Sequence, residues 1–257
     1  MSETIIITGA SRGIGAAVAR VGARLGMNLV VNARSASALD ALEASIGADE
    51  GRLAKVPGDI SEESTCTRIV EAATARFGGV DAVVNNAGTL EPVGALNQVS
   101  AEDWARNLAV NVMGPVTLSQ AALAPLGERH GRIINISSGA AVKAVRGWSA
   151  YCVSKAALNH FNRMLAAEFP EITSIAVSPG MTATDMQVLI RREGAGWMPE
   201  DEHRRFVDAH EKGELRAPDA VARAIVALAL HAPNEWSGEF LTVDDPKVRS
   251  LAETLPD

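Results

Sequence analysis

Short apolar runs alternate with longer stretches of helical periodicity along this chain, and the alternation constrains its fold more than any other feature. The first run, TIIITG at 4–9, is rich in β-branched residues and ends in glycine, as strands buried on both faces do. The next stretch, 13–26, has apolar residues at helical spacing and a glycine at its end. Strand–helix repeats of this kind form right-handed crossovers and a parallel sheet. We therefore expect an α/β fold with helices on both faces of a mostly parallel sheet.

The same pattern continues to residue 245. Strands are expected within 4–9, 28–34, 51–60, 80–88, 131–138, 172–180 and 239–245. Helices are expected over 13–26, 35–47, 61–78, 100–126, 149–169 and 217–232, with Ser61 capping the third. The segment 182–215 is a long insertion in the strand–helix alternation, and it follows the carboxyl end of the sixth strand. Ligands bind at the carboxyl ends of the strands in open parallel sheets. We interpret the segment as a substrate lid inserted in a single domain spanning 1–257; the alternative is a surface excursion.

Composition narrows the class of protein. Apolar residues make up 47% of the chain and charged residues 21%, as in a soluble globular protein with a large core. The net charge of −7 argues against a nucleic-acid or anionic-membrane partner, and no apolar run approaches the length of a membrane span. Cys66 and Cys152 are isolated, and the five histidines have no metal-ligand spacing. We expect a cytoplasmic protein without a metal or a disulfide.

The turn TGASRGIG joins the first strand to the first helix. Glycines at this junction let the backbone turn tightly and approach a pyrophosphate, while the helix N-terminus offers unpaired N–H groups to the anion. The spacing is Gly-x-x-x-Gly-x-Gly, and the strand–turn–helix context favours a dinucleotide. The candidate cofactor-binding residues here are Gly9, Ser11, Arg12, Gly13 and Gly15.

The end of the second strand indicates which dinucleotide binds. Ala33 stands where an acidic residue would hold the ribose hydroxyls of NAD(H), and Arg34 follows it. An arginine can grip a 2′-phosphate with two hydrogen bonds, and Arg12 can approach it from the glycine turn. The alternative is that both arginines are merely solvated. We predict that the cofactor is NADP(H).

Three further strand ends carry turns that fit the same pocket. In GDI at 58–60, Asp59 can accept a hydrogen bond from an adenine amino group, and Ile60 follows it. The small residues of NNAG at 85–88 allow a cofactor to lie against the backbone, and SPG at 178–180 contributes Pro179 and Gly180. Each is an ordinary turn when taken alone. Because parallel strands end at the same edge of the sheet, together they indicate one binding site.

A tyrosine and a lysine, Tyr151 and Lys155, have the i, i+4 spacing that places both side chains on one helical face. A nearby ammonium favours the phenolate, so we expect Lys155 to lower the pKa of Tyr151 from its ordinary value of about 10. Ser138 can then hold a substrate carbonyl while Tyr151 delivers a proton. Asn111 can hold a water in a proton relay. The alternatives are a serine that only caps a turn and an exposed asparagine.

These motifs, in this order and over nearly the whole chain, resemble the short-chain dehydrogenases/reductases. The resemblance implies a Rossmann-type, doubly wound, seven-stranded sheet in three α/β/α layers, and a catalytic tetrad. The implied tetrad is Asn111, Ser138, Tyr151 and Lys155, and the implied further cofactor contacts are Ile14, Asn86, Ala87, Gly88, Thr182 and Thr184, with Tyr151 and Lys155 also near the cofactor. The end GEFLTVDD lacks a glycine pair that many members carry, which leaves a homodimer as well as the common homotetramer.

Within the family, the segment 137–161 is similar to sepiapterin reductase and benzil reductase-like members, which reduce ketones or diketones with NADPH. Trp148, three residues before Tyr151, either lines a pocket for a flat substrate or packs under the lid. We expect an NADPH-dependent carbonyl reductase whose substrate is bound by Ser138, Trp148 and Tyr151. The alternatives are a 3-oxoacyl thioester reductase and a non-catalytic dinucleotide sensor.

Overall fold

The structure is a computed structural model that describes residues 2–47 and 51–256. Its sheet has the strand order β3-β2-β1-β4-β5-β6-β7, and all six neighbouring pairs are parallel. The strands are β1 (Thr4–Ile7), β2 (Asn28–Ala33), β3 (Leu53–Pro57), β4 (Ala82–Asn85), β5 (Arg132–Ile136), β6 (Thr173–Ser178) and β7 (Phe240–Thr242). This confirms the predicted doubly wound, Rossmann-type α/β/α fold.

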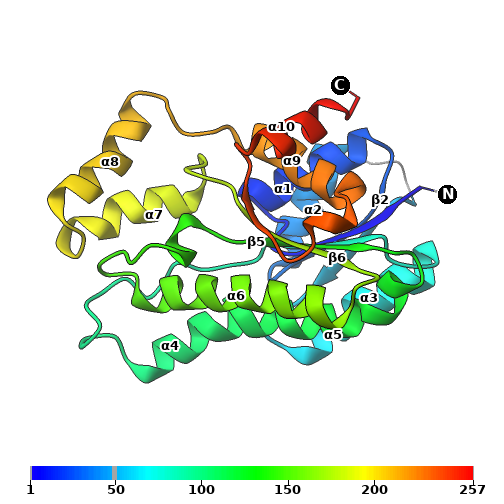
Figure 1. Ribbon diagram of the computed structural model, residues 1–257, viewed down its shortest axis with the longest axis horizontal. Helices are drawn as coiled ribbons and strands as arrows, with labels where there is room; N and C mark the ends of the chain where they lie inside the picture. The colour runs from blue at the N-terminus through cyan, green and yellow to red at the C-terminus, as the bar shows by residue number, and fades with distance from the viewer. Residues whose placement is uncertain (1, 48–50, 257) are drawn as a thin grey trace.

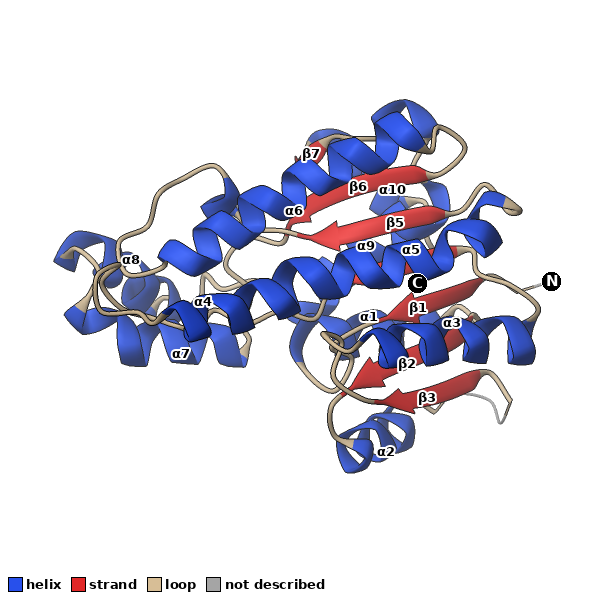
Figure 2. Ribbon diagram, turned by 90° about the horizontal axis from the view of Figure 1, so that it is seen from below, coloured by secondary structure: helices blue, strands red, loops and turns tan. Residues whose placement is uncertain are grey.

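Helices cover both faces of the sheet, as Figures 1 and 2 show. The α-helices are α1 (Gly13–Arg24), α2 (Ala36–Ile46), α3 (Glu63–Phe77), α4 (Ala101–Leu108), α5 (Gly114–Gly127), α6 (Ser149–Glu168), α7 (Asp185–Glu193), α8 (Glu200–Glu211), α9 (Pro218–His231) and α10 (Pro246–Glu253). The α1 and α9 helices lie on one face with α2 and α10, and α3, α5 and α6 lie on the other. No helix within these described residues is long and apolar enough to cross a membrane.

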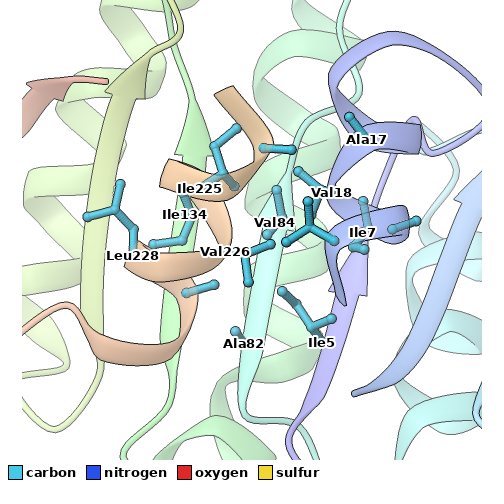
Figure 3. Packing of buried hydrophobic residues seen from close by; sticks show 14 of the residues in the cluster. Ile5, Ile7, Ala17, Val18, Ala82, Val84, Ile134, Ile225, Val226 and Leu228 are labelled. Atoms are coloured by element: carbon cyan, nitrogen blue, oxygen red, sulfur yellow. The ribbon is translucent and has the colours of Figure 1, made fainter. Parts of the chain in front are cut away.

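Alternation along each strand divides the core between the two faces. Ile5 and Ile7 pack with α1 and α9, whereas Ile6 between them packs on the opposite face. Figure 3 shows Ile5 and Ile7 beside Val84, with Ile225 and Val226 facing them from α9. Strands buried on both faces need apolar side chains at successive positions, which explains why the sequence shows runs rather than alternation.

Two local predictions about the helices need correction. The α3 helix begins at Glu63 with Glu62 as its cap, because Ser61 instead donates both its N–H and its hydroxyl to Asp59 Oδ1 at 2.9 and 2.8 Å. A short acidic side chain that captures the backbone two residues later is a common competitor of helix caps. The predicted helix over 100–126 is interrupted by a π-helical turn at Ala109–Met113.

The segment 182–215 is largely helical and lies beyond the carboxyl ends of the strands. It contains α7, a short 3₁₀ turn at Gly194–Gly196 and α8. In Figure 1 both helices extend to the side of the sheet, and in Figure 2 the strand arrows point toward them. The insertion therefore stands at the edge where the turns predicted to bind a ligand converge.

Candidate active site

The glycine turn holds the ends of β1 and β4 in close contact. Gly9 and Gly13 have φ angles of +62° and +55°, which glycine adopts without strain. A methyl group on Gly9 would lie 2.9 Å from Ala87 Cα, and one on Gly15 would lie 2.4 Å from the carbonyl oxygen of Gly9. Only glycine fits both positions, so the backbones of the turn and of the NNAG segment can approach each other closely.

Thr8, which the sequence analysis did not single out, fastens this turn to the NNAG segment. Its hydroxyl accepts hydrogen bonds from the backbone N–H groups of Asn86 and Ala87, both at 3.0 Å. The amide of Asn86 donates in return to the carbonyl oxygens of Thr8 and Gly9, at 2.8 and 3.2 Å. The side chain of Asn86 thus organises the turn, and its amide donors already have protein partners.

The start of the 182–215 segment lies across the glycine turn. A methyl group on Gly13 would come within 3.2 Å of Thr184 Cγ2, and Arg12 Nη1 pairs with Asp185 Oδ2 at 2.9 Å. Thr182 donates its hydroxyl to the carbonyl oxygen of Pro179. The predicted residues of the glycine turn and of 179–184 are therefore close together in space.

The candidates for the adenosine end of the cofactor occupy the neighbouring strand ends. Arg34 is exposed after β2, and Ser35 caps α2 by accepting from Ala38 N–H. A hollow of about 270 Å³ between the glycine turn and α2 is lined by Ser11, Arg12, Gly13, Ala38 and Ser45, among others. Asp59 is half-buried and bonded to Ser61, while Ile60 is buried against Gly114.

Tyr151 and Lys155 project from one face of α6 toward the end of β5. Lys155 Nζ donates to the carbonyl oxygen of Ile136 at 2.8 Å and lies 5.7 Å from the centroid of the Tyr151 ring. A methyl group on Gly88 would lie 3.6 Å from that Nζ and 3.1 Å from Asn111 Oδ1. The fold thus brings the lysine, the tyrosine and the asparagine to the exposed backbone of Gly88.

Asn111 lies in the π-helical turn and is fully buried, which excludes the alternative that it is a solvated side chain. Its Oδ1 accepts from Thr89 N–H at 2.8 Å, and its Nδ2 lies within hydrogen-bond distance of Thr89 O, Asn107 Oδ1 and Ser154 Oγ. The amide points inward, as expected, but its hydrogen bonds go to the protein. A π-helical turn at a functional site commonly re-aims one residue in this way.

Burial dominates the ionisation of the pair. It raises the pKa of Tyr151 to about 12, although a hydrogen bond with Ser138 partly opposes the rise. The same burial lowers the pKa of Lys155 to about 8. The prediction that Lys155 lowers the pKa of Tyr151 is therefore wrong for the protein as described, because removing the phenolate from water outweighs any attraction.

Ser138 caps a turn, as one of the two interpretations expected, and it also lies near Tyr151. Its hydroxyl accepts from Ala140 N–H at 3.1 Å and caps the short 3₁₀ turn Gly139–Ala141. It also hydrogen-bonds with Tyr151. The capping interaction fixes the serine at the end of β5, and the second contact places it beside the proposed proton donor.

The other side of Tyr151 meets the 182–215 segment in an apolar group that we name the Tyr151 cluster. Its buried members are Leu90, Ala140, Trp148, Tyr151, Ile190 and Met198, and Met186 and Phe206 pack against them. The rings of Trp148 and Tyr151 meet edge to face with their centroids 6.0 Å apart. The ring of Phe206 is tilted against that of Trp148, with a centroid distance of 5.7 Å. The Tyr151 hydroxyl faces Met186 Sδ at 3.9 Å. No sequence motif points to Met186, because its position follows from how the insertion folds.

Residues 3–194 match the family described as short chain dehydrogenase. The chain belongs to this family. As a short-chain dehydrogenase it is an oxidoreductase that uses a nicotinamide dinucleotide, and the bare glycine turn beside a helix N-terminus fits the pyrophosphate of such a cofactor.

Similar proteins within the family include oxidoreductases and benzil reductases. The oxidoreductase YIR035C of Saccharomyces cerevisiae is 36% identical over all of both chains, and its crystal structure superposes with a TM-score of 0.92 over 99% of this chain and all of that one. A benzil reductase, (S)-benzoin forming, of the same yeast, IRC24, is 34% identical over 96% of this chain and 98% of its own. A benzil reductase of Bacillus subtilis is 32% identical over 88% and 93%.

Proposed function

We propose that this short-chain dehydrogenase is an NADPH-dependent carbonyl reductase acting on ketones and diketones, with Tyr151 as the proton donor. The observation that carries the proposal is the convergence of Ser138, Tyr151 and Lys155 at the end of β5, with Lys155 Nζ next to the exposed Gly88. That arrangement supplies a proton donor, a cation and a hydroxyl at the edge where a nicotinamide ring would lie. A non-catalytic sensor has no need of this set.

Each residue has a distinct role in the proposed reaction. Ser138 holds the carbonyl oxygen of the substrate, and Tyr151 delivers a proton to that oxygen. Lys155 donates a hydrogen bond to the carbonyl oxygen of Ile136 and places a positive charge beside the phenol. It would also hydrogen-bond to the nicotinamide ribose. Asn111 acts as a positioning residue, because its amide ties Thr89 to Ser154 one turn from the pair. The bound cofactor supplies hydride to the carbonyl carbon.

The preference for NADP(H) is supported by charge at the end of β2. Arg34 is exposed there, and the preceding Ala33 provides no carboxylate to repel a 2′-phosphate. A hollow lies between the glycine turn and α2, the helix that follows Arg34. Arg12 borders the same hollow, although it now pairs with Asp185. The remaining proposed cofactor contacts lie on the turns at 9–15, 59–60, 86–88 and 179–184.

The substrate preference is supported by the apolar character of the Tyr151 cluster. Trp148 packs against the phenol and Phe206 packs against Trp148, and an aromatic lining of this kind suits a flat, aromatic carbonyl compound. The resemblance to benzil reductases points in the same direction. A 3-oxoacyl thioester on an acidic carrier protein suits the chain less well, since its net charge is −7. The lid role of 182–215, a homodimer or homotetramer, and a cytoplasmic location stay predictions.

The test is NADPH oxidation by the purified protein against benzil, an isatin, a pterin ketone, an aliphatic 3-ketoester and a simple sugar. We expect reduction of the aromatic dicarbonyls, and a fall of about 10³-fold in kcat for Tyr151→Phe, since general acid catalysis contributes about 10² to 10⁴. NADPH affinity, measured by fluorescence titration, should stay unchanged. Undiminished reduction by Tyr151→Phe would rule out the proposed acid, and failure of the wild type on every carbonyl would rule out the function.

A further inference from the structure

The indole N–H of Trp148 has no hydrogen-bond partner among the described residues, although Trp148 is only 5% exposed. Buried donors in proteins are normally paired, because a donor removed from water without a partner loses free energy. Most side chains packed with Trp148 in the Tyr151 cluster are hydrocarbon or thioether groups, and the indole N–H makes no hydrogen bond with the one phenol hydroxyl among them, that of Tyr151. The folded protein therefore keeps one unmet donor at this place.

The residue that carries the unmet donor packs against the proposed proton donor. Trp148 precedes Tyr151 by three residues, and the two rings meet edge to face with centroids 6.0 Å apart. Besides Ser138, the Tyr151 hydroxyl has Met186 Sδ as its partner in the described residues, at 3.9 Å, a weak acceptor on a flexible side chain. A substrate oxygen that takes its place would bring the rest of the substrate into the cluster that contains the indole.

On this basis we propose that Trp148 is a specificity-determining residue whose indole N–H donates to a second carbonyl oxygen, so that the site selects vicinal dicarbonyl compounds. The inference rests on the proposed carbonyl reductase function and adds the group that recognises the substrate. Two donors in an otherwise apolar cluster match a molecule with two neighbouring acceptor oxygens and apolar flanks. A monoketone of the same size leaves the indole N–H unpaired, and sites with unpaired donors discriminate strongly.

Benzil and deoxybenzoin test this directly, because they share one carbon skeleton and differ in the second oxygen. For each, kcat/KM is measured with the wild type, with Trp148→Phe and with Trp236→Phe, which alters a tryptophan next to Lys247 and outside the cluster. We expect Trp148→Phe to lower the ratio of benzil to deoxybenzoin by about tenfold, the size expected for one lost hydrogen bond. Trp236→Phe should leave the ratio unchanged. Comparing the ratio between variants cancels the greater intrinsic reactivity of the diketone.

Equal losses for both substrates in Trp148→Phe would overturn the proposal and leave Trp148 as a packing residue. If Trp148→Phe fails to fold, a second measurement on the wild type replaces it. This measurement follows the indole ¹⁵N–¹H resonance of Trp148 in the presence of NADP⁺. The resonance is assigned by replacing each of the other tryptophans, Trp104, Trp197 and Trp236, with Phe. Benzil should shift this resonance and deoxybenzoin should not. A resonance that moves equally with both overturns the proposal, whereas a wild type that reduces no carbonyl overturns the proposed function itself.

Discussion

The two sides of the candidate site are built in different ways. On the cofactor side, glycines at 9, 13 and 15 bring backbones together, and the polar side chains Thr8 and Asn86 are bonded to them. On the substrate side, α7 and α8 close over apolar rings, and three of the four unpaired buried polar atoms found in the described residues belong to Trp148, Gln187 and Arg191. Most of the buried polar groups on the first side have partners within the protein, whereas unpaired ones gather on the second.

This difference has a physical reason. A pyrophosphate and two riboses have one fixed shape, so a rigid backbone cradle recognises them well. Substrates differ between relatives of one fold, and side chains on an insertion can change without disturbing the sheet. The comparison predicts that substitutions on the cofactor side act mainly on stability and cofactor choice, while those in the 182–215 segment act on substrate choice.

The largest contrast is expected for two glycine-to-alanine changes. A methyl group on Gly15 would lie 2.4 Å from Gly9 O and 2.5 Å from Asn86 Nδ2, whereas one on Gly196 would meet nothing within 4 Å. We expect Gly15→Ala to lower the free energy of unfolding by about 3 kcal/mol, and Gly196→Ala to change it by less than about 0.5 kcal/mol. Urea denaturation measures both. Equal effects would show that the two surfaces are packed alike.

Lys155, at the border of the two sides, should make stability depend on pH. Its pKa is lowered to about 8 by burial from the ordinary 10.5, so between these values the unfolded chain binds more protons. The free energy of unfolding of the cofactor-free protein should therefore rise with pH from about 8 to 10, by up to about 1.4 kcal/mol per pH unit. Above about 10 the raised pKa of Tyr151 acts in the opposite direction.

Lysine variants isolate this contribution. Lys155→Met should abolish the rise between pH 8 and 10 in denaturation curves, and Lys143→Met, at an exposed position, should retain it. If the free energy of unfolding still rises between pH 8 and 10 in Lys155→Met, titratable groups other than Lys155 cause the rise. Cofactor is omitted in both cases, since its binding changes the charges around Lys155.

The fold and the placement of Tyr151 and Lys155 on one helix could be predicted from the sequence because their patterns are local. Short runs rich in apolar residues indicated all seven strands, and the i, i+4 spacing of Tyr151 and Lys155 holds on α6. The π-helical turn at Asn111 was missed, since apolar periodicity continues through it. The contact of Met186 with Tyr151 and the raised pKa of the phenol depend on how 182–215 closes, which no short pattern contains.

A smaller effect is expected for cofactor choice. Arg34→Asp places a carboxylate where we propose that the 2′-phosphate binds, so the affinity ratio of NADPH to NADH should fall by about tenfold or more. Arg204→Asp makes the same charge change on exposed α8 and should leave the ratio unaltered. Fluorescence titration with each dinucleotide measures the ratio. If both variants weaken NADPH alike, the effect is one of net charge and not of a phosphate contact.

The smallest effect joins the two sides of the site. Arg12 pairs with Asp185 at the first turn of α7, and both side chains are about two-thirds exposed or more, so the pair contributes little to stability. Asp185→Asn removes this pair and frees Arg12, which lines the hollow between the glycine turn and α2, and we expect NADPH to bind about twofold more tightly while NADH is unaffected. Asp208→Asn, which removes a similar exposed pair with Lys212 on α8, serves as the control. Weaker NADPH binding in Asp185→Asn would mean that the pair holds the 182–185 turn against the cofactor. In that case Arg12 stabilises the 182–215 segment and does not bind the 2′-phosphate.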